Sequence, residues 1–380
     1  MKKAIIIGAG FSGCVPAMLL RKRGWSVTVI DKAGFLGGGC RTFLHGGHPF
    51  TYGPRHFVSQ SKEAFDFLNQ YVPMRPIQKI NYTFVEADGA FYTYPIHEDD
   101  IDTMPEAAQI RRELAALPQE LKASQFEEFW IQRIGPTLYR KFVSEYNKKA
   151  WLLDSNTEMD FGYEVTVKRK PLETGSRYEF RDWFNAYPIA PDGYNRFFDI
   201  ALEGCEVRLK TTITGFDLQQ RAVTLSTGER LTGDMLISTI SLDELMDNQF
   251  GPLRYVGREF IKLVLPVEFA FPEDVYFVYY PNAGNIQTRA VEYKKLTRHQ
   301  SPSTLIGVEV PSLKNKLYPM MIRSEVDKAQ RYLDALPDQV FSLGRMGTYR
   351  YIDIDDIILQ SLAFVETLEG KLSRTAAEVS

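Results

Sequence analysis

The chain contains few cysteines and histidines, and this scarcity excludes several classes of protein. Its 380 residues include 3 cysteines and 5 histidines. Cys14, Cys40 and Cys205 are too few and too widely separated for a disulfide framework or a CxxC metal site. The histidines show no HxH or HExxH spacing, so we expect no metal site. No GxSxG sequence indicates a serine hydrolase.

Long apolar runs and an excess of one charge are also missing. The first apolar run, residues 4–7, ends at Gly8 and is too short for the apolar part of a signal peptide. No run approaches the roughly 18 apolar residues of a membrane-spanning helix. Lys and Arg number 45 against 48 Asp and Glu, a net charge of -3 that offers no basic field to nucleic acid. We therefore expect a cytoplasmic protein with no membrane span and no nucleic-acid partner.

Aromatic residues, in contrast, are abundant and make up 13% of the chain. The apolar share of 44% and the charged share of 24% are those of an ordinary globular protein. The length predicts enough core for two or three domains.

The N-terminal residues predict a βαβ unit that binds a dinucleotide. The apolar strand 4–7 leads into GAGFSG at residues 8–13, a helical run follows, and a second strand spans residues 26–30. This is the GxGxxG pattern, in which the glycines permit a tight turn and the close approach of a pyrophosphate to the backbone. Free amides at the start of the helix favour phosphate groups. Asp31 ends the second strand, where a carboxylate binds ribose hydroxyls.

The segment after Asp31 distinguishes FAD from NAD. Residues 37–42, GGGCRT, are similar to the Gly-Gly-x-x-Arg-Thr/Ser stretch that passes the flavin in glutathione-reductase-like flavoproteins such as amine oxidases. NAD dehydrogenases usually continue with a helix at this point. We therefore expect FAD as the tightly held cofactor, with a flexible glycine loop as the alternative.

Motifs dispersed along nearly the whole chain resemble those of the UDP-galactopyranose mutase family. These flavoenzymes interconvert the pyranose and furanose rings of a nucleotide sugar. The most specific of the motifs is GRMGTYRYID at residues 344–353. The others are YGPRHF at 52–57, FVSEYNKKAW at 142–151, DWFNAYPIAPDGYNRFF at 182–198, STISLDELMDNQFGPL at 238–253, and Thr288-Arg289 with Glu292 and Lys294.

The resemblance implies an α/β fold. We expect a discontinuous Rossmann-like, glutathione-reductase-like FAD-binding domain, a helical domain and an antiparallel β-sheet domain. The expected boundaries are 1–75 with 195–245 and 335–372 for the FAD domain, 100–155 for the helical nucleotide-binding domain with a mobile loop at 160–180, and 76–99 with 181–194 and 246–334 for the β-sheet substrate domain.

Arginines form the expected catalytic set. By the resemblance, Arg289 and Arg345 clamp the substrate diphosphate, and Arg169 joins them from the loop at 160–180. Guanidinium groups suit this role because each can donate two hydrogen bonds to phosphoryl oxygens. Other basic residues of the loop compete with Arg169, and a run of charge is often only a solvated face.

The other substrate-binding residues are mostly aromatic. We expect Phe142 and Tyr146 to stack on the base and Trp151 to lie near the ribose and phosphates, although an aromatic stripe at this spacing is also typical of a core. The full set is Phe142, Tyr146, Asn147, Trp151, Trp183, Tyr279, Tyr318, Tyr351, Arg55 and Asp353. The expected cofactor-binding residues are Gly8, Gly10, Phe11, Ser12, Gly13, Asp31, Lys32, Gly38, Gly39, Cys40, Arg41, Tyr52, Gly53, Pro54, Arg55, His56, Thr212, Thr239, Gly344, Arg345, Tyr351, Asp353 and Ile354.

Departures from the family pattern leave the substrate open. Arg55 replaces a histidine of the family and could reach an N-acetyl or carboxyl group on the sugar. Tyr279 stands where an asparagine usually recognises the edge of uracil, and Asn147 replaces a threonine. A site that loses a hydrogen-bonding side chain usually changes its partner. The nucleotide is therefore UDP, TDP or GDP, and the sugar is galactose or a relative such as N-acetylgalactosamine.

The predicted function is that of a flavin-dependent mutase. The resemblance implies that N5 of reduced FAD attacks the anomeric carbon of the nucleotide-diphosphate sugar, with NAD(P)H as a possible external reductant. An amine-oxidase-like or desaturase-like FAD oxidoreductase is the first alternative, because it shares the N-terminal motifs. A non-catalytic FAD-binding protein is the second. We also expect a homodimer.

Overall fold

A parallel sheet forms one end of the molecule in the computed structural model, which describes residues 1–159, 171–272 and 274–378, with side chains up to Leu368. Its strands lie in the order β10-β2-β1-β14-β20. They are β1 (Lys3–Ile7), β2 (Ser26–Ile30), β10 (Glu206–Arg208), β14 (Met235–Ser238) and β20 (Val340–Ser342). Short apolar strands of this kind suit a parallel sheet, because both of its faces are covered.

Helices cover one face of this sheet and a small antiparallel sheet covers the other. Helix α1 (Phe11–Lys22) links β1 to β2 and packs against α12 (Ile354–Glu378), and α2 (Lys62–Asn69) and α7 (Asn195–Ala201) lie beside them. The small sheet comprises β11 (Ile213–Asp217), β12 (Ala222–Leu225) and β13 (Arg230–Thr232). Ile5 and Ile7 of β1 share a buried cluster with Val223 and Leu225 of β12. This arrangement confirms the expected Rossmann-like α/β fold.

A second, mostly antiparallel sheet lies beside the first and has the order β19-β15-β18-β17-β16-β7-β8. Its strands are β7 (Ile80–Val85), β8 (Ala90–Tyr94), β15 (Tyr255–Leu265), β16 (Val275–Tyr279), β17 (Arg289–Glu292), β18 (Thr304–Ser312) and β19 (Tyr318–Pro319). Smaller pieces join the two halves: the sheet β5 (Phe57–Ser59)-β9 (Phe184–Pro188)-β6 (Met74–Pro76), the hairpin β3 (Phe43–His45)-β4 (His48–Phe50), and the short helix α9 (Tyr293–Thr297).

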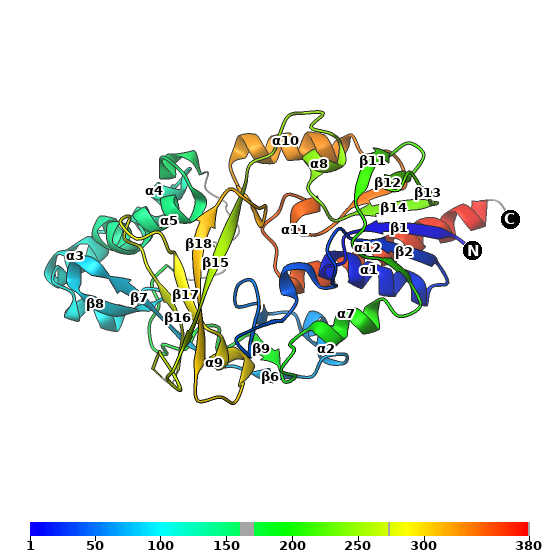
Figure 1. Ribbon diagram of the computed structural model, residues 1–380. Coiled ribbons are helices and arrows are strands. Elements are labelled where there is room, and N and C mark those ends of the chain that lie inside the picture. Colours follow the sequence, from blue (N-terminus) through cyan, green and yellow to red (C-terminus); the bar gives the residue numbers. More distant parts are fainter. Residues whose placement is uncertain (160–170, 273, 379–380) are drawn as a thin grey trace.

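A helical segment lies at the far end of the second sheet, opposite both termini (Figure 1). It contains α3 (Ala107–Ala115), α4 (Phe126–Leu138), a π-helical turn η4 (Tyr139–Ser144) and α5 (Glu145–Trp151). π-Helical turns occur often at functional sites. The one here immediately precedes the helix that carries Tyr146 and Trp151.

The remaining elements are short turns and helices that connect those already described. They are η1 (Gly38–Cys40), η2 (Glu86–Asp88), η3 (Glu98–Thr103), η5 (Asn156–Glu158), α8 (Leu242–Leu245), α10 (Arg323–Asp334) and α11 (Gly344–Gly347). Of these, η3 and η5 contact the helical segment. The GRMGTYRYID motif occupies α11 and the turn that leads from β20 into α12. Within the described ranges, no helix is both long and apolar enough to cross a membrane.

Candidate active site

Three glycines shape the turn between β1 and α1. A Cβ on Gly13 would lie 1.9 Å from the carbonyl oxygen of Gly8, and a Cβ on Gly8 would lie 2.1 Å from Oγ1 of Thr239. These two glycines are therefore required by packing. A Cβ on Gly10, in contrast, would meet no atom of the described chain within 4 Å, apart from its own neighbours. Gly10 caps the N-terminus of α1, where no side chain caps the helix, so open space lies where a pyrophosphate would meet helix amides.

Other expected flavin segments lie against the same turn. The amide of Gly37 donates to the carbonyl of Ala9 at 2.7 Å, and a Cβ on Gly38 would lie 3.6 Å from Cα of Gly10. A Cβ on Gly344, whose φ is +79°, would lie 2.0 Å from Oγ of Ser12. Segments 8–13, 37–40 and 344 thus surround the helix start. This cradle fits the diphosphate of FAD.

Asp31 is held in place by backbone amides. Its carboxylate accepts hydrogen bonds from the amides of Ala9 and Ala33, each at 2.7 Å. Thr239 donates from Oγ1 to the carbonyl of Ile7 at 2.7 Å. Lys32 is exposed, and Thr212 accepts a bond from Ser226 in the β11–β12 region. Among the described hydrogen bonds, none joins Lys32 or Thr212 to the glycine turn.

Two tyrosines from distant segments stack on each other. The rings of Tyr318 on β19 and Tyr351 after α11 have centroids 5.3 Å apart and an interplanar angle of 15°. The indole of Trp151 meets both rings edge-on, at 6.3 and 6.1 Å. Three expected substrate residues from three segments are therefore in contact.

Arg345 lies against this tyrosine pair. Its Cζ is 4.8 Å from the ring centroid of Tyr318 and 4.9 Å from that of Tyr351. Its Nε donates to the carbonyl of Ile352 at 2.9 Å, and its Nη2 donates to Oδ1 of Asp353 at 3.0 Å. The guanidinium is thus fixed beside the turn that holds Tyr351 and Asp353.

Arg289 is fixed by a carboxylate that the sequence analysis did not identify. Arg289 and Glu309 are register partners on β17 and β18. Nε and Nη2 of Arg289 donate to the Glu309 carboxylate at 3.1, 2.7 and 2.9 Å. Burial lowers the pKa of Arg289, but Glu309 together with the neighbouring tyrosines raises it well above its ordinary value, so the group stays charged. One signal for Glu309 existed: it is the one charged residue in the strand TLIGVEVPS.

Tyrosine rings continue from Arg289 toward the helical segment. The Cζ of Arg289 lies 5.8 Å from the ring centroid of Tyr279. That ring in turn meets Tyr94 at 4.5 Å and Tyr146 at 5.8 Å. Burial, and then Tyr279, raise the pKa of Tyr146, so its phenol stays protonated. Tyr279 thus presents a ring rather than an amide to this region, as the sequence indicated.

Arg55 connects the flavin segment to the tyrosine pair. Its Nε donates to the carbonyl of Gly39 at 3.2 Å, and its backbone adopts a φ of +37°. Burial lowers the pKa of Arg55, whereas Tyr318 and Cys40 raise it above its ordinary value. Conversely, burial would raise the pKa of Tyr318, but Arg55 and Arg345 hold it below its ordinary value. A residue strained into the left-handed region between two parts of a site indicates a functional constraint.

Some expected site residues make their described contacts elsewhere. Phe142 is 3% exposed and packs against Tyr92 in the helical core, at 5.9 Å. Asn147 donates from Nδ2 to Oδ1 of Asn156 at 3.0 Å and to the Met159 sulfur at 3.3 Å. Trp183 packs against Phe180 at 5.2 Å. Arg169 lies outside the described residues.

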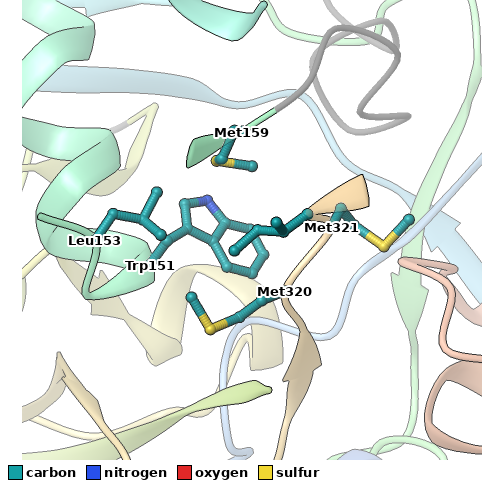
Figure 2. Close-up of a pocket in the computed structure, with 6 residues that line it drawn as sticks. Trp151, Leu153, Met159, Met320 and Met321 are labelled. Carbon is teal, nitrogen blue, oxygen red and sulfur yellow. The ribbon is translucent and has the colours of Figure 1, made fainter. Parts of the chain in front are cut away.

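An apolar group of side chains surrounds Trp151, the tryptophan that contacts the tyrosine pair. The space among them has no room for a water molecule and is lined by Trp151, Leu153, Met159, Met320, Met321 and Ile322. Figure 2 shows the indole of Trp151 between Met159 and Met320. Because every one of these side chains is apolar apart from the indole nitrogen, this wall disfavours water beside the tyrosine pair.

The comparisons with known proteins identify the family. A model described as UDP-galactopyranose mutase matches residues 141–351, more than half of the chain. The chain belongs to the UDP-galactopyranose mutase family. A model of an NAD(P)-binding Rossmann-like domain matches residues 6–71. Together these matches imply FAD as the cofactor.

Relatives align along almost their full length. The chain is 25% identical to a dTDP-fucopyranose mutase of Escherichia coli, over 95% of this chain and 97% of that protein. It is also 25% identical to a probable UDP-galactopyranose mutase of Klebsiella pneumoniae, over 95% of this chain and 93% of that protein. A crystal structure of reduced UDP-galactopyranose mutase has the same fold, with a TM-score of 0.84 and 19% identity, over 97% and 96% of the two chains.

Flavin oxidoreductases share the fold but match less of the chain in sequence. A putative protoporphyrinogen oxidase of Exiguobacterium has a TM-score of 0.70 at 15% identity over 97% of this chain, which shows the fold alone. In sequence, two phytoene desaturases cover 44% and 45% of this chain. The chain is therefore a flavin-dependent mutase of nucleotide sugars, which is an isomerase, and the oxidoreductase alternative is not supported.

Proposed function

We propose that the protein interconverts the pyranose and furanose forms of UDP-galactose or a related nucleoside-diphosphate sugar, and that it is active when its FAD is reduced. The proposal is carried by the contact between three parts of the site. The glycine cradle, Arg55 and the Arg345–Tyr318–Tyr351 group follow one another in space, so a cofactor in the cradle and a diphosphate at the tyrosines would share one site.

FAD in its reduced form supplies a nucleophile for the anomeric carbon. The chain supplies position and charge. Arg345 and the Tyr318 phenol bind phosphoryl oxygens and stabilise the charge of the departing diphosphate. Arg289 adds a second guanidinium, whose orientation Glu309 fixes. The apolar wall at Trp151 excludes water that would hydrolyse the sugar.

The described part of the site carries an excess of positive charge. Four guanidiniums, those of Arg55, Arg258, Arg289 and Arg345, accompany the two carboxylates of Glu309 and Asp353 among the described residues. A nucleoside-diphosphate sugar brings two negative charges, which would neutralise this excess. Arg169 would add one more positive charge, so charge does not choose between an N-acetyl and a carboxyl group at Arg55, and UDP-N-acetylgalactosamine is one candidate.

The base, the assembly and the reductant belong to the same proposal. Relatives of equal identity are named for a dTDP sugar and a UDP sugar, so identity does not choose between the bases. We propose a cytoplasmic homodimer whose flavin is kept reduced by NAD(P)H.

The test is a substrate panel. Reduced holoenzyme is incubated with UDP-galactose, UDP-N-acetylgalactosamine and dTDP-fucose, and the products are separated by chromatography. We expect at least one substrate to give an isomer of unchanged mass that carries a furanose ring. An oxidised product, or no product from any of the three, would contradict the proposal.

Arg345→Ala should retain FAD and lose turnover, whereas Arg230→Ala, which removes an exposed pair with Asp217, should retain both.

A further inference from the structure

The arginines of the site differ in whether their charge is already compensated. Arg289 pairs with Glu309, and Arg345 pairs with Asp353. Arg258, on β15, forms no ion pair with any carboxylate of the described residues. Its Nη1 donates to the carbonyl of Gly257 at 2.7 Å. Since a partly buried guanidinium without a counter-ion is costly, this charge indicates an anionic ligand.

The backbone of Arg258 is held on both sides by a single side chain. Oδ1 of Asn315 accepts from the Arg258 amide at 3.1 Å, and Nδ2 of Asn315 donates to the Arg258 carbonyl at 3.0 Å. A Cβ on Gly257 would lie 1.9 Å from that Oδ1, so only glycine allows the clamp. The backbone at Arg258 is therefore held in one position before any ligand binds.

The guanidinium of Arg258 lies over one ring of the tyrosine pair. Its Cζ is 5.2 Å from the ring centroid of Tyr318. Burial raises the pKa of Tyr146, and Arg258 is one of the cations that oppose that rise, so its charge also reaches the ring that lies beside Tyr279. Arg258 thus contacts the ring of Tyr318 on the diphosphate side, and its charge acts on Tyr146 on the nucleoside side.

We propose that Arg258 is a diphosphate-binding residue that contacts the phosphate nearer the nucleoside. This inference rests on the proposed function, since it assumes a nucleoside diphosphate in the site. It assigns the uncompensated charge of Arg258 to substrate binding, while the paired Arg289 and Arg345 mainly orient the departing diphosphate.

The test measures binding without turnover. UDP, dTDP and GDP, and the matching nucleosides uridine, thymidine and guanosine, are titrated into oxidised holoenzyme by calorimetry. Arg258→Gln should weaken the diphosphate that the wild type binds by about tenfold to a hundredfold and change nucleoside affinity less than about twofold, because one charge-assisted contact is lost. Arg258→Lys should lose less affinity for the diphosphate, because lysine keeps the positive charge. Arg254→Gln is the matched control, because it lies four residues away in an exposed pair with Glu158.

The possible results distinguish a failure of the role proposed for Arg258 from a failure of the proposed function. If the wild type binds a diphosphate but Arg258→Gln binds it equally well, or loses diphosphate and nucleoside affinity by the same factor, the inference is wrong and the proposed function stands. If the wild type binds none of the three diphosphates, both are wrong. Flavin content and thermal melting show whether each variant is folded, and Arg258→Lys supplies the measurement should Arg258→Gln not fold.

Discussion

Replacing Glu309 by glutamine tests whether this carboxylate positions Arg289. Glu309 is 3% exposed and accepts three hydrogen bonds from one guanidinium. Glutamine has nearly the same shape and keeps one acceptor oxygen, but it removes the charge and replaces the other oxygen by a donor. The substitution therefore weakens the hydrogen bonds that orient the Arg289 guanidinium, with little change in side-chain volume.

The geometry sets the expected magnitude. A hydrogen bond to a charged group contributes about 1.5–3 kcal/mol. The substitution leaves at most the two bonds to Oε1, now to an uncharged acceptor, and places an amide donor opposite Nη2. We expect the free energy of unfolding to fall by about 2–3 kcal/mol. A guanidinium displaced by about 1 Å can reduce the rate about a hundredfold, so kcat should fall about tenfold to a hundredfold. KM should not rise, because the charge of Arg289 is no longer compensated and still attracts the diphosphate.

Glu259→Gln is the control. Glu259 lies on β15, is exposed, and pairs with Lys314 at 2.8 Å. Glu259→Gln makes the same chemical change on a neighbouring strand. Exposed ion pairs contribute only about 0–1 kcal/mol to the free energy of unfolding, so this variant should be nearly as stable as the wild type. Urea unfolding and steady-state kinetics on both variants give the comparison. If Glu309→Gln resembles Glu259→Gln in stability and in kcat, or if it raises KM while kcat is unchanged, the positioning role is refuted.

Two further predictions concern the cofactor and the tyrosine pair. Gly10→Ala should fold with unchanged stability, because its Cβ meets no described atom within 4 Å, yet it should lose most of its bound FAD; retention of a full complement of flavin would disprove the cradle. For Tyr318, burial raises the pKa, but Arg55 and Arg345 outweigh it and hold the pKa below its ordinary value of 10.0. Nucleoside-diphosphate affinity should therefore fall as the pH rises through that lowered pKa, because the phenolate repels phosphate, and Tyr318→Phe should abolish this fall; an unchanged pH profile in the variant would exclude the phenol as its cause.

Local signals made the dinucleotide unit predictable from the sequence. The glycine spacing at residues 8–13 and the short apolar strands on either side of the helix depend on neighbouring residues alone. The structure agrees closely, with β1 at Lys3–Ile7, α1 at Phe11–Lys22 and β2 at Ser26–Ile30. The substrate residues Arg289, Arg345, Tyr318 and Tyr351 followed from motif resemblance, not from any local physical signal.

Contacts set by strand register were not predictable. Glu309 lies opposite Arg289 because β17 and β18 pair in one particular register, and nothing within either strand specifies it. Arg258 is one of three charged residues along β15, and only the clamp from Asn315 and the nearby Tyr318 distinguish it. For Phe142, helical spacing allowed either a core or a base-stacking role, and the observed contact with Tyr92 belongs to the core.

An isomerisation transfers no net electrons, so the proposed function requires a flavin that stays reduced through every turnover. The most direct measurement is anaerobic turnover after a single reduction of the holoenzyme, with the flavin absorbance recorded throughout. We predict many furanose products per flavin while the flavin stays reduced, and no product from the oxidised enzyme. Reoxidation of one flavin for each sugar converted, or equal turnover by the oxidised enzyme, would contradict the account.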